Sequence, residues 1–146
     1  MVPIEITTLL IPGENDSPQE IEALSAWVME RLGADVPLHF TAFHPDWKML
    51  DKPPAATLLE ARRIARAAGL HYVYTGNIPD EATQSTYCHG CGALLIGRDW
   101  HAIKRLADDG RCASCGTACG GVFDGPPDAP GLRRRPLVLD LASDGR

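Results

Sequence analysis

The sequence has 146 residues, of which 45% are hydrophobic, and its formal net charge is −5 at pH 7. This length suits one ordinary domain or two small ones, and the apolar content excludes wholesale disorder. The acidic balance argues against a nucleic-acid partner, and no apolar run approaches the roughly 20 residues that span a membrane. Residues 1–5 lack signal-peptide features, and paired cysteines in odd number suit a reducing compartment, so we expect the cytoplasm.

The first predicted strand and helix lie between residues 4 and 33. Residues 4–11 are rich in β-branched and apolar side chains and predict a buried parallel strand. Ser17, Pro18 and Glu20 then have the spacing of an N-cap, a first-turn proline and a capping box. Apolar residues recur at helical spacing after them, and Gly33 ends the pattern.

The same alternation of strand and helix continues to about residue 80. Residues 36–43 predict a second strand, residues 54–68 a second helix that ends at Gly69, and residues 71–75 a third strand. The order β-α-β-α-β with short links predicts parallel strands joined by right-handed crossovers.

The composition changes after this α/β part, which we expect to cover residues 1–80. Residues 85–123 hold all five cysteines and seven of the fourteen glycines, so turns and metal ligation dominate there. We predict a four-cysteine zinc-ribbon or rubredoxin-like domain over this range. Residues 124–146 begin with a Pro- and Gly-rich stretch and predict a flexible tail.

Two Cys-x-x-Cys-Gly knuckles, residues 88–92 and 112–116, carry the strongest functional signal. Two residues between cysteines allow a tight turn to direct both sulfurs at one ion, and the following glycine permits the left-handed conformation that such a turn needs. Four thiolates form the closed tetrahedral shell of structural zinc, although similar knuckles also hold iron. We predict zinc, or iron, bound by four ligands: Cys88, Cys91, Cys112 and Cys115.

One cysteine and two histidines near the knuckles are not expected to bind the metal. Cys119 makes a C-x2-C-x3-C pattern with the second knuckle, which is the reverse of the C-x3-C-x2-C loop of radical-generating clusters, so a free thiol is the expected state. His89 and His101 are interpreted as surface residues because four thiolates already complete the shell.

Four segments of the sequence resemble one enzyme family. Residues 5–17 (EITTLLIPGENDS) resemble radical SAM enzymes of the pyruvate formate-lyase-activase type. Residues 36–45 (VPLHFTAFHP), 72–77 (YVYTGN) and 85–88 (STYC) are similar to the AmmeMemoRadiSam system radical SAM enzyme. The four segments occur in the right order between about Pro3 and Phe123, and together they look like the C-terminal half of that enzyme.

The resemblance implies a radical SAM (β/α)6 partial barrel with an appended ribbon. Such enzymes cleave S-adenosylmethionine with a reduced [4Fe-4S] cluster to form a 5′-deoxyadenosyl radical. The sequence has neither their cluster-binding C-x3-C-x2-C loop nor the glycine-rich strand that holds the methionine amino group. It therefore looks like the last three barrel strands plus the ribbon, from a truncated gene, a split gene or an internal start. Implied partners are the missing N-terminal half of the barrel and Memo-like and Amme-type proteins.

The resemblance also implies a side of the barrel on which S-adenosylmethionine would bind. His44 stands where activase-type enzymes carry a histidine near the adenosyl group, and Gly13 and Asn15 lie in the loop after the first strand. Turn and cap chemistry alone also accounts for Gly13 and Asn15, and a turn role is favoured for Asn77. Thr7 replaces a basic residue that is frequent in activases, and no catalytic residue is identified.

Three functions remain open from the sequence. The first is the C-terminal portion of a radical SAM enzyme, inactive without its other half. The second is a non-catalytic zinc-ribbon module that docks a partner, and the third is a redox protein that uses Cys119 or an iron-loaded ribbon. The missing cluster loop argues against radical chemistry by this chain alone, and the roughly 80 residues before the ribbon argue against a bare ribbon.

Overall fold

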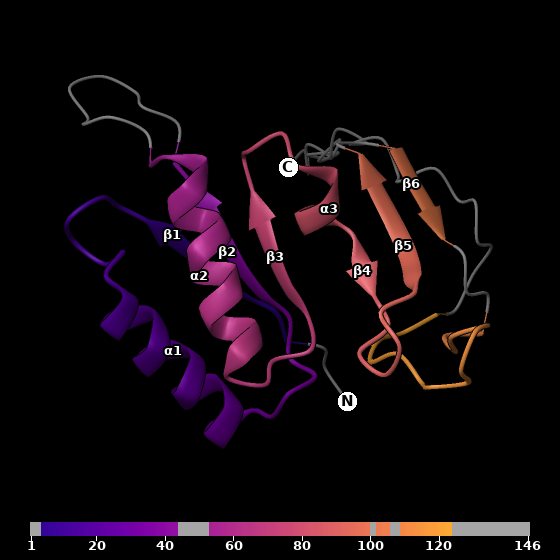
Figure 1. The fold of residues 1–146 in the computed structure, drawn as a ribbon. Helices are drawn as coiled ribbons and strands as arrows, with labels where there is room; N and C mark the ends of the chain where they lie inside the picture. Colours follow the sequence, from indigo (N-terminus) through magenta and orange to yellow (C-terminus); the bar gives the residue numbers. More distant parts are fainter. Residues whose placement is uncertain (1–3, 44–52, 100–101, 106–108, 124–146) are drawn as a thin grey trace, which may run out of the picture.

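The computed structural model describes residues 4–43, 53–99, 102–105 and 109–123 of the chain. Within these ranges, two three-stranded sheets lie side by side, one parallel and one antiparallel (Figure 1). None of the helices in the described ranges is long and apolar enough to cross a membrane.

The N-terminal part is the predicted β-α-β-α-β unit. Its strands pair in parallel in the order β1-β2-β3, which is also their order in the sequence. Each observed element falls within the range predicted for it or extends one residue beyond it. The elements are β1 (Ile6–Leu10), α1 (Pro18–Arg31), β2 (Leu38–Ala42), α2 (Ala55–Ala67) and β3 (Val73–Gly76).

Local sequence signals account for the helix ends. The Ser17 hydroxyl caps α1 as predicted by accepting a hydrogen bond from the Glu20 N–H at 3.3 Å. The same hydroxyl donates to the Glu20 carboxylate at 2.7 Å, a contact that differs from the bond to the Ser17 N–H expected of a capping box. Pro54 precedes α2 without a side-chain cap. Gly33 and Gly69, which follow the two helices, both have positive φ angles that permit the chain to leave the helix.

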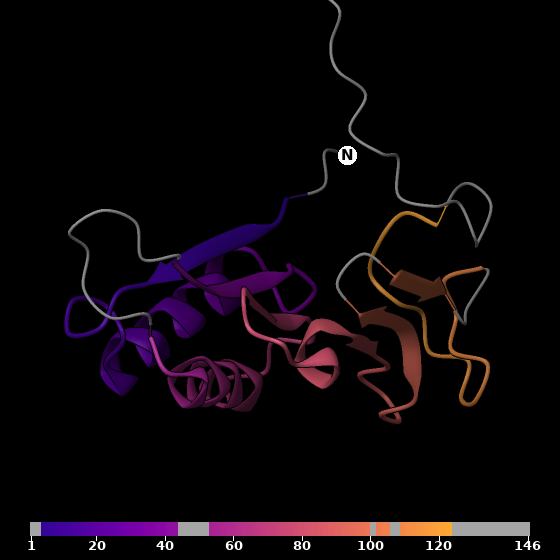
Figure 2. The same ribbon diagram turned by 90° about the horizontal axis from the view of Figure 1, so that it is seen from above.

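Both helices cover the same face of the parallel sheet (Figure 2). Their inner sides form one apolar cluster with alternate residues of the three strands, because alternate residues of a strand point to the same face. The members of this core are Leu10, Ile21, Val28, Leu38, Phe40, Ala42, Leu58, Ala61, Ile64, Ala65, Leu70, Val73 and Ile78.

The opposite face of the sheet carries no helix among the described residues, and we call it the helix-free face. Two rows of side chains cross it in register. His39 lies in the middle of the first row, with its ring 5.0 Å from that of Tyr74, and its Nε2 is 3.3 Å from the carboxylate of Glu5. The rows are Thr7, His39 and Tyr74, followed by Leu9, Thr41 and Gly76.

Strand β1 differs from the buried strand that the sequence predicts. It pairs only with β2 in the described part of the chain, so it lies at the edge of the sheet. Leu10 is fully buried, whereas Leu9 is 43% exposed and Thr7 is also exposed. The apolar run indicated burial on both faces, but the helices cover only one of them.

The second sheet is antiparallel and begins after α3 (Glu81–Gln84). It contains β4 (Thr86–Tyr87), β5 (Leu94–Asp99) and β6 (Ala102–Arg105). The predicted tail at 124–146 lies outside the described residues.

Arg98 and Tyr74 join the two sheets. The Arg98 guanidinium lies 5.3 Å from the centre of the Tyr74 ring and donates to the Thr86 hydroxyl at 2.6 Å. The Tyr74 hydroxyl is 2.8 Å from the same Thr86 oxygen. Because these residues lie on β3, β4 and β5, the ribbon is fixed beside the outer edge of β3.

Candidate metal centre

The two knuckles have the same backbone geometry. In the first, the Cys88 N–H donates to the Ala93 carbonyl at 2.8 Å, and the Gly92 N–H donates to the Cys88 carbonyl at 2.8 Å. In the second, the corresponding bonds join Cys112 to Thr117 at 2.9 Å and Gly116 to Cys112 at 2.7 Å. The two Cys-x-x-Cys-Gly segments therefore form two copies of one turn.

The glycine of each knuckle adopts the conformation that the spacing predicts. Gly92 has a φ of +76° and Gly116 a φ of +75°, in the left-handed region that most residues avoid. A Cβ atom added at either position would meet nothing within 4 Å. The conformation of the backbone, and not lack of space, is therefore the reason for glycine at these positions.

The four knuckle sulfurs converge on one point. The sulfurs of Cys88 and Cys115 are 3.5 Å apart, those of Cys91 and Cys112 are 3.6 Å apart, and all four lie within 4.8 Å of one another. Zinc–sulfur bonds of about 2.3 Å at the corners of a tetrahedron place the sulfurs about 3.8 Å apart. The arrangement can therefore accept a metal ion with little movement.

Burial follows the symmetry of the two turns. The first cysteine of each knuckle, Cys88 or Cys112, is buried, and the second, Cys91 or Cys115, is exposed. The ion would therefore lie between a small apolar layer and solvent. Gly90 faces the other knuckle, since a Cβ atom there would come within 2.6 Å of the Thr117 hydroxyl.

Hydrogen bonds and neighbouring sulfurs move the pKa values of the thiols in opposite directions. The hydroxyl of Thr117 lies 3.2 Å from the Cys115 sulfur, and this contact, with the Thr117 N–H, lowers the pKa of Cys115 to about 6. The Ala93 N–H lowers the pKa of Cys91, but the sulfurs of Cys115 and Cys112 together raise it to about 12.

Two opposing effects act on the pKa of the Cys112 thiol. Burial raises this pKa, but the N–H groups of Ser114 and Cys115 lower it by more, so the net shift is downward. Four thiolates so close together would repel one another without a cation between them, which is why the neighbouring sulfurs raise the pKa of Cys91. A divalent ion at the centre would neutralise part of this charge.

Cys119, the expected free thiol, lies next to the site but outside the group of four. It is partly buried and packs against the apolar layer that Cys88, Leu95 and Cys112 form. Burial and a hydrogen bond to Cys119 raise the pKa of the Tyr72 hydroxyl above its usual range. The same hydroxyl accepts the Gly120 N–H at 2.8 Å, so Tyr72 connects the α/β unit to the chain after the second knuckle.

His89 is more than the surface residue that the sequence suggested. It is half-buried, and its ring stacks on that of His71 with 4.0 Å between the ring centres and 4° between the planes. His71 Nδ1 lies 2.9 Å from a carboxylate oxygen of Asp35. Sequence reasoning missed this group because its members are far apart in the chain, and only the fold brings them together. His101, the other residue interpreted as exposed, lies outside the described residues.

The residues that the resemblance implies for S-adenosylmethionine have structural roles in the described chain. Asn15 accepts the Ile11 N–H at 2.8 Å and donates to the Leu9 carbonyl at 2.9 Å, which closes the turn after β1. Gly13 has a φ of +78°, and its N–H donates to Asp16. Asn77, with a φ of +61°, donates to the Ala42 carbonyl at the end of β2. His44 lies outside the described residues.

Comparison with known proteins gives one relative. The uncharacterized protein MJ0808 of Methanocaldococcus jannaschii is 42% identical over 118 residues, which are 77% of this chain and 35% of the relative. The chain thus spans about a third of the length of the curated protein that it matches. No family model matches the chain, and no solved structure matches it.

Proposed function

We propose that the four cysteines bind one zinc ion that holds the ribbon together, and that the α/β unit is the C-terminal portion of a radical SAM enzyme. The convergence of four sulfurs within 4.8 Å of one another carries the first part. Four thiolates fill the coordination shell of zinc and leave no position for a substrate, so the role is structural.

Elemental analysis tests the proposed zinc site. Protein made in medium replete in zinc and iron is expected to contain about one equivalent of zinc, because four thiolates form a closed zinc shell. One equivalent of iron would instead indicate a rubredoxin-like centre. A [4Fe-4S] absorption band after anaerobic reconstitution would contradict the proposal.

The winding of the parallel sheet supports the radical SAM part of the proposal. The strands follow one another across the sheet in sequence order, and both helices lie on one face. In a doubly wound sheet the order reverses and helices cover both faces, whereas in a barrel the helices stay outside and the other face lines the interior. The helix-free face corresponds to such an interior, and polar side chains of Thr7, His39 and Tyr74 cross it.

In this proposal the pocket for S-adenosylmethionine lies at the carboxyl ends of β1, β2 and β3. Gly13, Asn15 and His44 follow β1 and β2 in the chain and are its proposed neighbours. The [4Fe-4S] cluster supplies the electron that cleaves S-adenosylmethionine when it is bound. The five cysteines of this chain contain no C-x3-C-x2-C loop, so another segment or chain must hold the cluster.

The first proposed partner is the N-terminal half of the barrel, which would pair with the open edge of β1. Leu9 at 43% exposure and Ile4 at 58% give this edge an apolar character. Open edges of this kind pair readily with other chains. Memo-like and Amme-type proteins are further proposed partners by family resemblance, and the thiolate site favours the reducing cytoplasm.

Two measurements test the radical SAM proposal. We expect the 146-residue chain to form no 5′-deoxyadenosine from S-adenosylmethionine under strong reductant, and the DNA upstream of Met1 to encode a C-x3-C-x2-C motif in frame. The longer polypeptide, reconstituted with iron and sulfide, should then form 5′-deoxyadenosine. Formation of 5′-deoxyadenosine by the 146-residue chain alone would contradict the proposal that the cluster is held by another portion of the enzyme.

A non-catalytic zinc-ribbon interaction module is the second candidate, favoured by the missing cluster motif. Absence of the motif from the upstream sequence, together with no product from any longer form, would favour this candidate over the enzyme. The zinc measurement does not separate the two, since both contain the ribbon.

A further inference from the structure

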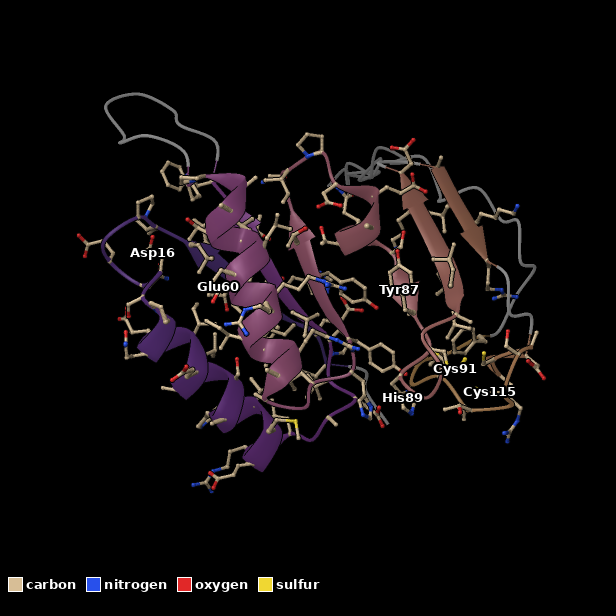
Figure 3. The ribbon with its side chains drawn as sticks, in the orientation of Figure 1. Asp16, Glu60, Tyr87, His89, Cys91 and Cys115 are labelled. Atoms are coloured by element: carbon tan, nitrogen blue, oxygen red, sulfur yellow. The ribbon has the colours of Figure 1, made fainter. Side chains whose placement is uncertain are left out.

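Three metal-ligand side chains meet where the ribbon contacts the α/β unit. Asp35 comes from the loop between α1 and β2, His71 from the segment before β3, and His89 from inside the first knuckle. One ligand atom from each lies within 4.8 Å of the other two. Figure 3 shows His89 between the ribbon and the α/β unit, close to Cys91.

We propose that Asp35, His71 and His89 form a second metal site, for a divalent transition ion such as zinc, that joins the ribbon to the α/β unit. Two imidazoles and a carboxylate are ligands that zinc and its neighbours in the first transition row accept. The proposal does not depend on the radical SAM assignment, because it uses only the contact between the two parts of this chain.

The closest pair of ligand atoms lies slightly nearer together than an ion requires. His71 Nδ1 and Asp35 Oδ1 are 2.9 Å apart, within hydrogen-bonding distance. Metal bonds of about 2.0–2.2 Å at the corners of a tetrahedron place neighbouring ligand atoms about 3.3–3.6 Å apart. The two atoms must therefore separate by about half an ångström, which side-chain rotation can supply because Asp35 is exposed.

His89 completes the group after a side-chain rotation. Its ring is parallel to that of His71, so one ring must turn for both nitrogens to point at the same ion. Asp35 is exposed and His71 is half-exposed, which leaves room for this adjustment. The buried Tyr72 places its hydroxyl 3.4 Å from His89 Nδ1 and limits how far the His89 ring can move.

Three protein ligands leave at least one coordination position for water or an exogenous ligand, in contrast to the closed site of four thiolates. The second site should therefore bind metal more weakly than the first. Metal binding at the second site should also require metal at the four-cysteine site. His89 lies between two of the cysteine ligands, so its position is fixed only when the knuckle folds.

Cobalt titration of the full chain, without a histidine tag, tests the second site. The cysteines are first filled with one equivalent of zinc, and the protein is then titrated with cobalt. We expect one further equivalent to bind with the weak d–d absorption of nitrogen and oxygen ligands and without a thiolate charge-transfer band. Asp35→Ala and His71→Ala should each weaken this second equivalent at least tenfold, as loss of even an outer-shell partner can do.

His39→Ala is the matched control. His39 is also a half-buried histidine beside a carboxylate, Glu5 at 3.3 Å, but it belongs to no three-ligand group in the described chain. This variant should keep the second equivalent. Unchanged cobalt binding in Asp35→Ala and His71→Ala, or binding that appears only with thiolate charge transfer, would overturn the proposal. His89→Ala should weaken binding of the second cobalt equivalent as much as His71→Ala does, and it should still keep zinc at the four cysteines.

Discussion

The α/β unit and the ribbon lie side by side but are stabilised by different interactions. Among its described residues, the α/β unit has thirteen buried apolar side chains in one cluster, contributed by three strands, two helices and the loops after them. In the ribbon, the buried cluster has three members, and two of them are the cysteines Cys88 and Cys112. Hydrophobic burial can stabilise the first region, whereas in the second the proposed ligation would hold the chain segments together.

The exposed side chains show the same difference. Ile103 on β6 is 55% exposed and Val122 after the second knuckle is 73% exposed, so the ribbon leaves apolar surface in solvent. Small metal domains gain most of their folding free energy from the ion and little from a core. On the proposed zinc assignment, we expect the ribbon to fold only as it binds the ion and the α/β unit to fold without that ion.

The largest expected effect comes from removing one thiolate. Cys112→Ser should release the metal and unfold the ribbon, because ligation contributes on the order of 10 kcal/mol of apparent free energy to such domains. Cys119→Ser should keep both metal and ribbon, since Cys119 lies outside the group of four. Zinc content and amide exchange measure the outcome, and equal metal loss in both variants would mean that the fourth ligand is misassigned.

The second effect belongs to the α/β core. Phe40 is fully buried in the middle of β2, and Phe40→Ala should lower the free energy of unfolding of this unit by about 3–5 kcal/mol. Trp27→Ala removes a larger side chain that is 51% exposed and should cost far less. Urea denaturation measures both variants. Similar losses would show that the helical face carrying Trp27 is covered in solution.

A smaller effect is expected from the knuckle glycines. Gly92→Ala and Gly116→Ala should each cost about 1–2 kcal/mol, because an L-residue must adopt the left-handed conformation, and nothing else obstructs the new methyl group. Zinc affinity should fall roughly tenfold for each 1.4 kcal/mol. Clearly unequal losses in the two variants would contradict the equivalence of the two turns.

The smallest effect concerns His39 and pH. Burial lowers the pKa of His39 below 6.5, although the carboxylate of Glu5 opposes this shift. The unfolded chain therefore binds more protons at this residue, and stability is lost as the pH falls through 6.5. His39→Gln removes this contribution, so its stability should fall less between about pH 8 and pH 5.5 than that of the unchanged protein. Identical pH profiles would show that His39 titrates normally, and any pH-dependent zinc loss is common to both proteins.

The sequence was sufficient for the features that depend on local patterns. Periodicity and caps predict the five elements of the α/β unit, and Ser17 caps α1 as expected by accepting the Glu20 N–H. The Cys-x-x-Cys-Gly spacing predicts four sulfurs around one point, as observed. Both patterns are encoded within a few residues, where local geometry decides the structure.

Features that depend on the assembled fold were not predictable in the same way. The apolar run of β1 indicates burial but does not reveal that only one face receives helices. Asp35, His71 and His89 come from separate segments, and their pattern appears only after the ribbon is placed beside β3. The short helix α3 could have been found from Asp80, whose side chain caps it by accepting the Thr83 N–H.

The two edge strands of the parallel sheet, β1 and β3, have different neighbours, so another chain could add to the sheet at β1 but not in the same way at β3. On the side of β3, the ribbon occupies the outer edge through Tyr74, Thr86 and Arg98. On the side of β1, the backbone groups of the outer edge have no strand partner in the described chain. Pairing of two β1 edges with each other would consume both of them. Self-association through β1 therefore ends at two copies, and a complementary strand from another polypeptide competes for that same edge.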